Sequence, residues 1–422
     1  MIAKIFIGND NNIGKKAVAW NMVASLLYSF QSALMLLVVT RVAGLVVGGI
    51  FSIAYTVSQM FASVGSFSMR DFQVSDVRNK YSYSTYISSR ILTLIIMVLG
   101  CLSYSLMQGY SGEKLIILMI LSFYRAVDGA DDVIQGEIQK RGRLDIAAKM
   151  LACRIFLSTS VFMVGVLLTK NLLLSVVLFT GAAIILSLLI NLSVVSELQI
   201  KGTITIKGIG HLLWECLPIC AGAFLYNYLV NSPKYAIDSV LTTDMQTIFN
   251  IIFMPVFVTT MLGNFVFKPY VVRMGELWND GELKKYVFLV FKLMAVITVL
   301  GVCVVLGGTL LGIPVLGWIY GVELSKYRLV FVALLCFGGV SAINAFLAVA
   351  LTVMRRQYYI ILGYIVALIV DILLMNKLVE RYELMGAGLV YGLVMIVTGL
   401  VFWFGMLIGL LKKRRKNGNQ NI

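Results

Sequence analysis

Apolar runs of about 20 residues recur along the whole 422-residue chain, and only short polar stretches separate them. A helix needs about 20 apolar residues to cross the hydrocarbon core of a bilayer. The composition agrees, because 60% of the residues are hydrophobic, 13% are charged and the mean hydropathy is +0.92. Soluble domains are about a quarter charged. We therefore expect an all-α integral membrane protein with no soluble domain of useful size.

The apolar runs predict twelve transmembrane helices. The first run is too long for the core of a signal peptide, so we expect it to be retained as a helix. The predicted spans are 17–40, 43–68, 84–108, 115–134, 149–169, 171–194, 212–240, 245–267, 286–308, 327–352, 358–376 and 384–410. Because twelve is even, both ends of the chain fall on one side of the membrane.

Lysine and arginine are distributed unevenly between the two sides that these spans define. The polar stretches on the side of the termini, with Lys149 at a helix edge, hold 23 of the 35 Lys and Arg residues, and the opposite side holds seven. Cytoplasmic loops carry such an excess of positive charge. The bias predicts cytoplasmic termini, with "KKRRKNGNQNI" as a short basic tail, and it accounts for most of the +15 net charge without a nucleic-acid partner.

Two stretches half a chain apart repeat one pattern. "GSFSMRDFQV" (65–74) matches "GNFVFKPYVV" (263–272) at an offset of 198, and each ends the second helix of a six-helix unit. Because six is even, the two halves cross the membrane in the same sense, as a parallel repeat with a pseudo-two-fold axis along the membrane normal. We expect an N-terminal lobe over 1–200 and a C-terminal lobe over 201–422, with a transport site between them. A weaker match pairs Asp131 with Asn344 and predicts lobes of unequal charge.

The fourth span carries four charges within eight residues, in "SFYRAVDGADDVIQGEIQKRGRLD" (122–145). One helical stripe runs through Arg125, Asp128, Asp132, Gln135 and Gln139, at steps of three and four. Each charge facing lipid costs about 2.5–3.5 kcal/mol, so four would cost on the order of 10 kcal/mol. We therefore expect the stripe to face protein or a water-filled cavity, and Arg125 to pair with Asp128. The alternative is a closed salt-bridge network that holds helices together, with Asp131 and Asp132 wet at the cytoplasmic end.

Other cations lie at membrane depth and are candidate partners for these carboxylates. They are Arg90, Arg154, Lys234 and Lys292, with Arg41 at the outer end of the first span. A buried cation in a transmembrane helix is a candidate functional residue. Arg154 and Lys292 are near enough to the cytoplasmic side for snorkelling to be the alternative.

The seventh span contains an unusual polar stretch, "YNYLVNSPKYAIDSVL" (226–241). Pro233 removes a backbone hydrogen bond and is expected to kink or break the helix. Asn231 precedes the proline, and Lys234 and Asp238 are one turn apart. A broken polar helix is typical of a transport site or gate, and a simple kink with a Lys234–Asp238 pair is the alternative. Asp371 in the eleventh span is a further intramembrane acid.

Catalytic and metal-binding patterns are missing from the sequence. The six cysteines lie in apolar contexts, and Cys216 and Cys220 have no second pair to complete a metal set. The single histidine, His211, has no cluster of metal-ligating residues around it. The sequence contains neither a nucleophile–base pair nor a phosphate-cradling loop. We therefore expect a transporter rather than an enzyme, with no cofactor and no metal.

Two loop motifs resemble a known family. "GSFSMRDFQVSD" (65–76) and "DVIQGEIQKRGRLD" (132–145) are similar to the large cytoplasmic loops of the bacterial polysaccharide-biosynthesis flippases. These are the lipid-linked-oligosaccharide branch of the multidrug/oligosaccharidyl-lipid/polysaccharide exporter superfamily. The resemblance extends over the whole chain and implies two six-helix bundles packed as a V around a central cavity. It also implies export of undecaprenyl-pyrophosphate-linked oligosaccharide across the bacterial cytoplasmic (inner) membrane, by alternating access, for lipopolysaccharide or capsule.

The resemblance further implies a cationic cavity for pyrophosphate and acidic sugars, because a diphosphate that crosses a low dielectric needs Arg or Lys contacts. By charge and depth, that cavity would contain Arg41, Arg90, Arg125, Arg154, Lys234 and Lys292. The polar and ion-coupling candidates are Asp128, Asp131, Asp132, Asn231, Asp238 and Asp371. Expected partners are the lipid-linked glycan, membrane lipid, a polysaccharide polymerase or other assembly proteins, and a proton or sodium gradient.

Three alternatives stay open. A cation-coupled multidrug exporter of the same fold should place buried acids against a cationic drug, whereas the first span offers only Asn21 and Gln31. A flippase for the lipid-linked peptidoglycan precursor usually has helices beyond twelve. A membrane-embedded glycosyltransferase or polymerase usually has a large outer loop with catalytic residues, whereas 309–326 contains only Glu323 as an acid.

Overall fold

The computed structural model describes residues 6–7, 12–76 and 79–419, which contain helices and no strand. The long helices are α2 (Ile13–Ala43), α3 (Leu45–Ser66), α5 (Tyr83–Met107), α6 (Gly112–Lys140), α7 (Leu144–Thr169), α8 (Leu172–Glu197), α9 (Ile209–Val240), α10 (Thr243–Phe267), α12 (Leu283–Gly307), α14 (Arg328–Val353) and α15 (Tyr358–Asn419). Non-helical angles at Glu383 interrupt α15 (φ 50°, ψ −132°). Each predicted span overlaps one of these helices, and the last two lie on either side of Glu383. The all-α fold is confirmed, and the count of twelve spans stays a prediction.

Short helices follow the second long helix of each half. They are α4 (Met69–Ser75) after α3, and η1 (Lys268–Tyr270) with α11 (Val271–Asn279) after α10. These are the two stretches that match at an offset of 198, so the sequence repeat coincides with a structural one. The other short helices are η2 (Gly308–Gly312), α13 (Ile313–Tyr320) and η3 (Ser325–Tyr327).

The helices make this a multi-pass membrane protein. Among the described residues, ten helical segments are long and apolar enough to cross a membrane. The charged α6 is not one of them, although its 29 residues are long enough. A helix of that composition can be accommodated at bilayer depth only if its charges face protein or water.

The chain divides into two compact units, Met1–Asn227 and Tyr228–Ile422. The division falls inside α9, whereas the predicted lobes meet at 200/201, in the connection that precedes α9. The first turns of α9 belong to the first unit, because Leu212 and Cys216 are buried in a cluster with Tyr81 and Tyr86. The arrangement of the two lobes around a central cavity stays a prediction.

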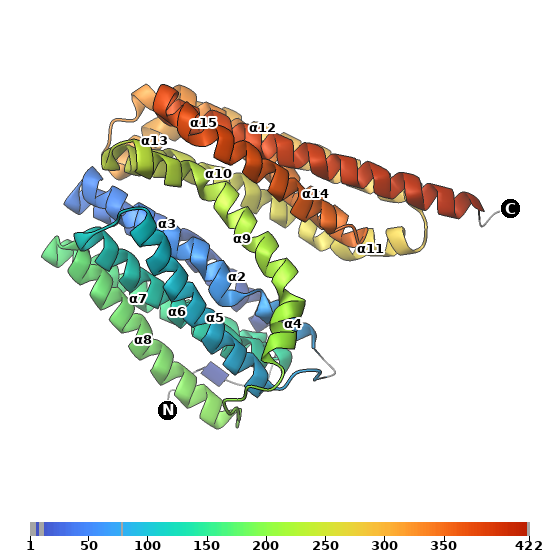
Figure 1. Ribbon diagram of the computed structural model, residues 1–422, viewed down its shortest axis with the longest axis horizontal. Helices are drawn as coiled ribbons and strands as arrows, with labels where there is room; N and C mark the ends of the chain where they lie inside the picture. Colours follow the sequence, from blue (N-terminus) through green and yellow to red (C-terminus); the bar gives the residue numbers. More distant parts are fainter. Residues whose placement is uncertain (1–5, 8–11, 77–78, 420–422) are drawn as a thin grey trace. The chain divides into compact units, whose positions relative to one another are not determined.

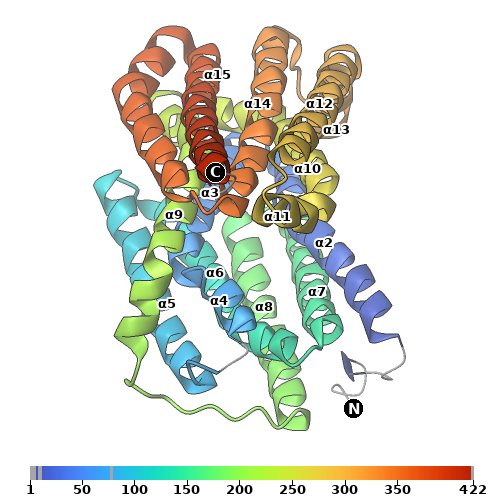
Figure 2. The same cartoon turned by 90° about the vertical axis from the view of Figure 1, so that its right-hand side faces the viewer.

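The two units share a packing pattern, which can be followed helix by helix in Figure 1 and Figure 2. In the first unit, α3, α5 and α6 all contact one another, and α7 contacts α2 and α8. In the second unit, α10, α12 and α14 all contact one another, and α14 contacts α15. In both units the second, third and fourth spans form the mutual contacts, as a parallel repeat predicts.

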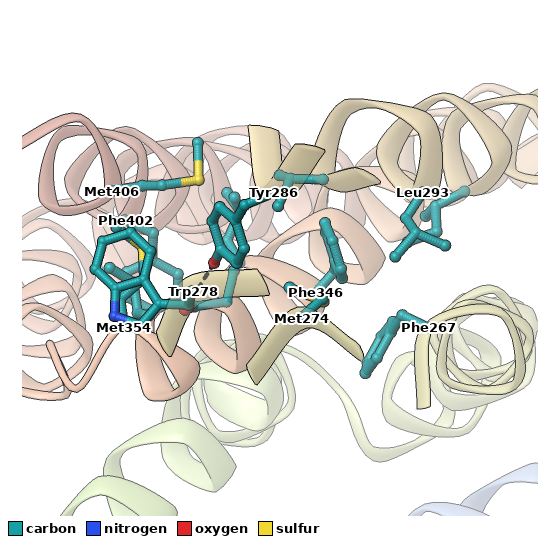
Figure 3. Packing of buried hydrophobic residues seen from close by; sticks show 14 of the residues in the cluster. Phe267, Met274, Trp278, Tyr286, Leu293, Phe346, Met354, Phe402 and Met406 are labelled. Atoms are coloured by element: carbon teal, nitrogen blue, oxygen red, sulfur yellow. Dashed lines mark hydrogen bonds between the residues drawn. The ribbon is translucent and has the colours of Figure 1, made fainter. Parts of the chain in front are cut away.

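The second unit has a large apolar core, shown in Figure 3. Aromatic and methionine side chains from α10, α11, α12, α14 and α15 fill it, and the Tyr286 hydroxyl donates to the Ala350 carbonyl at 3.4 Å. The α14 residue that the sequence paired with Asp131 is Asn344, whose amide nitrogen donates to the Met395 carbonyl at 2.7 Å. The fourth span is therefore highly charged in the first unit and nearly neutral in the second, as predicted.

The Asp76 carboxylate connects the end of α4 to residues that precede and begin α5. Asp76 Oδ1 accepts from the Lys80 amide at 2.8 Å, and Oδ2 accepts from the Tyr81 amide at 3.0 Å and the Tyr86 hydroxyl at 3.3 Å. Burial by itself would raise the pKa of the Asp76 carboxyl, but the donors lower that pKa below its ordinary value. The ionised carboxylate fixes the end of α4, which carries Arg70.

Candidate functional site

The charged stripe of α6 lines a cavity of about 690 Å³ within the first unit. Every member of the predicted stripe is in its wall, so the expectation that α6 faces a cavity is confirmed. Other walls come from the first half of α2, the end of α3, the start of α7 and the middle of α9. The polar and charged lining residues are Asn21, Ser25, Tyr28, Ser29, Gln59, Ser63, Ser66, Arg70, Arg125, Asp128, Asp132, Gln135, Gln139, Arg154 and Asn227.

Arg125 is the first α6 residue in this wall and is 1% exposed. It donates from Nη1 to Asp128 Oδ2 at 2.8 Å, as the three-residue spacing predicted, and to the Tyr28 hydroxyl at 3.4 Å. Its guanidinium carbon is 4.5 Å from the centre of the Tyr55 ring. The Nε and Nη2 atoms have no hydrogen-bond partner among the described residues. A buried guanidinium with unused donors can bind an anion that enters the cavity.

Asp128 bridges two arginines. Its Oδ1 accepts from Arg154 Nη2 at 2.5 Å while its Oδ2 accepts from Arg125. Arg154 also pairs through Nε with Asp131 Oδ2 at 2.7 Å. The prediction that Arg154 is a partner of the α6 acids is confirmed, and the snorkelling alternative is wrong, because its side chain is 1% exposed between two carboxylates.

Asp131 is not one of the residues that line the cavity. It accepts hydrogen bonds from Ser187 and, at 2.6 Å, from Asn191, both on α8. The suggestion that Asp131 is wet at the cytoplasmic end is wrong, because it is buried. Its role in the structure is to tie α6 to α7 and α8.

Asp132 bridges a second pair of arginines. Its Oδ2 accepts from Arg90 Nη2 at 2.7 Å, and its Oδ1 accepts from Arg70 Nη1 at 3.0 Å. Arg90 is buried and also donates to the Gly65 carbonyl at 2.7 Å. Arg70 was missed as a site residue because the sequence placed it in a cytoplasmic loop. Its match with Lys268 at an offset of 198 was the available signal.

The cluster is net positive. Four arginines surround three aspartates, and all three carboxylates are already paired with guanidinium groups. The wall therefore presents arginine side chains to a molecule in the cavity, together with hydroxyl and amide groups. Anions are better matched to this surface than cations.

A hydrogen-bond network of uncharged side chains holds the residues around Arg125. The Gln31 side chain is buried, donates to Thr159 Oγ1 at 2.9 Å, and accepts at Oε1 from the Tyr124 and Tyr55 hydroxyls at 3.1 and 3.3 Å. Gln31 thus holds the tyrosine rings that surround the Arg125 guanidinium.

Replacing Gln31 with leucine is expected to lower the free energy of unfolding by about 1–3 kcal/mol, because buried hydroxyl groups lose their shared partner. Thermal unfolding of the purified protein in detergent measures the change. Gln108→Leu is the matched control, since Gln108 is exposed at the end of α5. Equal melting temperatures for the two variants would contradict this role for Gln31.

The other predicted site residues lie away from this cluster. Arg41 is exposed in the last turn of α2, and Lys292 is exposed on α12. Lys234 is buried in the second unit, with its Nζ 5.5 and 5.6 Å from the ring centres of Phe253 and Phe257. The alternative of a Lys234–Asp238 pair stays a prediction.

The polar stretch of the seventh span stays helical. The α9 helix runs through Pro233 from Ile209 to Val240, so the proline does not break it. Asn231 and Asp238 are half-buried on this helix. Asp371 is buried and accepts from Ser232 Oγ at 2.7 Å, which joins α15 to α9 within the second unit. The described residues contain no group of side chains that could hold a metal ion.

No known family model and no curated protein matches this chain. Several solved structures match this chain. A lipid II flippase, MurJ, in an inward closed conformation, gives a TM-score of 0.68 at 14% identity over 93% of this chain and 90% of that one. An inward-facing multidrug resistance MATE family transporter of the MOP superfamily gives 0.62 at 12% identity over 94% and 98%.

A third solved structure that matches is described by the polarity of its binding pocket. It is a MOP superfamily transporter from Pyrococcus furiosus, described as having a binding pocket of reverse polarity, and its TM-score is 0.54 at 14% identity over 98% of both chains. At such identities the likeness shows the fold, which is that of the MATE and MOP transporters.

Proposed function

We propose that this protein is a flippase that moves an undecaprenyl-pyrophosphate-linked oligosaccharide from the cytoplasmic to the outer leaflet of the bacterial inner membrane, for surface polysaccharide biosynthesis. The observation that carries the proposal is the arginine-rich wall of the first-unit cavity, with Arg125 and Arg154 as lining residues. A pyrophosphate must leave water to cross the membrane, and guanidinium groups replace its hydration with charged hydrogen bonds.

The remaining lining fits a glycan. Side-chain amides and hydroxyls such as Asn21, Gln59 and Tyr28 surround the arginines. Sugar hydroxyls both donate and accept hydrogen bonds, and these groups can satisfy both kinds. The lipid tail would remain in the bilayer during transport.

Transport would proceed by alternating access of the two lobes. Asp128, Asp238 and Asp371 are the candidates for binding a coupling proton or sodium ion. Asp128 is shared between two arginines, so it would also reset the site by taking back both guanidinium groups when the anion leaves. The termini would be cytoplasmic, and the glycan would pass to a polymerase or another assembly protein on the outer side.

The test is to delete the gene and determine on which face of the membrane the undecaprenyl-linked oligosaccharide collects, using a membrane-impermeant lectin or periodate. We expect accumulation on the cytoplasmic face, relieved by the wild-type gene. Normal outward display in a strain without a second flippase would reject the proposal.

The second candidate is a multidrug exporter, which is favoured by the fold match to a MATE transporter and by the buried Asp371. The wall of the first-unit cavity argues against it, because its carboxylates are already paired with arginine and its remaining charge would repel a cationic drug. Drug-resistance profiles of the deletion strain separate these candidates. If lipid II rather than another glycan collects, the chain is a peptidoglycan precursor flippase.

A further inference from the structure

The connection from α8 to α9 follows a defined path along the start of α5. Residues 200–208, "IKGTITIKG", are called the strap below, and they run between the two helices in Figure 2. Ile200 is buried against α8. The Thr203 amide then donates to Ser84 Oγ, and the Thr205 amide donates to Ser88 Oγ, each at 2.9 Å. Two serines one turn apart on α5 thus hold the backbone of the strap.

Two glycines shape the strap. A Cβ on Gly202 would lie 2.6 Å from Ile87 Cδ1 and 2.9 Å from Tyr83 Cδ1, so a side chain there would force these α5 side chains to shift. Gly208 has a φ of +82°, which favours glycine, and it leads directly into α9. The Thr85 hydroxyl also donates to the Lys207 carbonyl at 3.3 Å. The strap is therefore anchored to α5 along most of its length.

The outer side of the strap is apolar. Ile204 and Ile206 are 79% and 89% exposed. They are two residues apart, so in extended backbone they project to the same side. Lys201 and Lys207 flank them and are also exposed. Such a pattern, with apolar residues between cations and no acid, is unfavourable in water and suited to a membrane surface.

The strap lies at the level where candidate membrane spans end. It begins three residues after the end of α8, leads directly into α9, and is hydrogen-bonded to the first turns of α5. The ends of spans lie near the boundary between acyl chains and headgroups. Anionic lipids at that boundary attract lysine.

We propose that the strap is a membrane-surface anchor, in which Ile204 and Ile206 insert among the acyl chains and Lys201 and Lys207 contact the phosphates of anionic phospholipids. The anchor holds the beginning of α9 at the membrane surface. This inference concerns the protein in its membrane and does not depend on which molecule is transported.

The experiment uses the full chain in vesicles of phosphatidylcholine and phosphatidylglycerol, with Cys153, Cys303 and Cys336 first replaced by serine. A nitroxide is attached at Ile206→Cys, and its collisions with oxygen and with a water-soluble nickel chelate are compared. Asp280→Cys, in an exposed polar turn, is the aqueous control. Leu192→Cys, at a position 68% exposed on α8, is the control within a span.

We expect the ratio of oxygen to nickel collisions at position 206 to be several-fold higher than at 280 and to approach that at 192. Lys201→Gln with Lys207→Gln should lower the ratio at 206 in vesicles with phosphatidylglycerol and leave it unchanged in pure phosphatidylcholine. A ratio equal to that at 280 would overturn the anchor, and so would shielding from both reagents, which would mean that protein covers the strap. An unchanged ratio after removal of both lysines would overturn the phosphate contacts.

Discussion

Replacing Arg125 with alanine is expected to reduce outward display of the lipid-linked oligosaccharide by about 10- to 100-fold. A hydrogen bond to a charged group contributes about 1.5–3 kcal/mol, and 1.4 kcal/mol corresponds to a tenfold change. Two buried nitrogen atoms of Arg125 have no hydrogen-bond partner among the described residues, so a pyrophosphate that reached them would gain these contacts. The measurement is surface labelling with a membrane-impermeant lectin in a deletion strain that carries the variant gene.

The variant should remain folded, because Asp128 keeps its 2.5 Å contact with Arg154 when Arg125 is removed. Membrane levels of the protein check this point. Arg125→Lys keeps the charge but loses the two-pronged geometry, so we expect an intermediate loss. Lys170→Ala removes an exposed cation outside the cavity wall and serves as the matched control, with wild-type display expected. Full transport by Arg125→Ala would contradict the role proposed for Arg125.

Replacing Asp128 with asparagine is expected to destabilise the protein by about 3–5 kcal/mol, because both of its arginine partners would lose a buried anion. Those partners, Arg125 and Arg154, have side chains that are 1% exposed, so water cannot readily compensate their charge. The Asp128 side chain itself is 15% exposed, which places the effect toward the lower end of that range. Thermal unfolding in detergent and the amount of protein in membranes measure the loss.

A matched pair of variants separates charge from packing at this position. Asp280→Asn makes the same chemical change at an exposed turn, and we expect no shift in melting temperature. Combining Asp128→Asn with Arg125→Gln should restore part of the lost stability, because the second change removes one of the two arginine charges that Asp128→Asn leaves without this carboxylate. If Asp128→Asn melts like the wild type, the bridging carboxylate contributes nothing to the fold.

Much of the fold could be predicted from the sequence because a bilayer imposes strict requirements on a chain. Each apolar run had to be long enough to span the hydrocarbon core, and the predicted ranges overlap the observed helices for that reason. The steps of three and four between Arg125, Asp128 and Asp132 are enough by themselves to place these residues on one helix face. The high cost of a charge in lipid then required that face to meet protein or water, and it lines a cavity.

The partners of those charges were decided by the tertiary structure alone. Arg70 lies in a short helix that the sequence presented as a loop, and it pairs with Asp132, which is 62 residues away. The sequence allowed Arg154 either to pair with the α6 acids or to snorkel to the membrane surface. The packing of α7 against α6 and α8 buries it between Asp128 and Asp131. Lys234 had an acid at helical spacing, yet it lies against Phe253 and Phe257 of a neighbouring helix. Local periodicity determines which residues share a face, whereas the rotation and contacts of distant helices determine which side chain each of them meets.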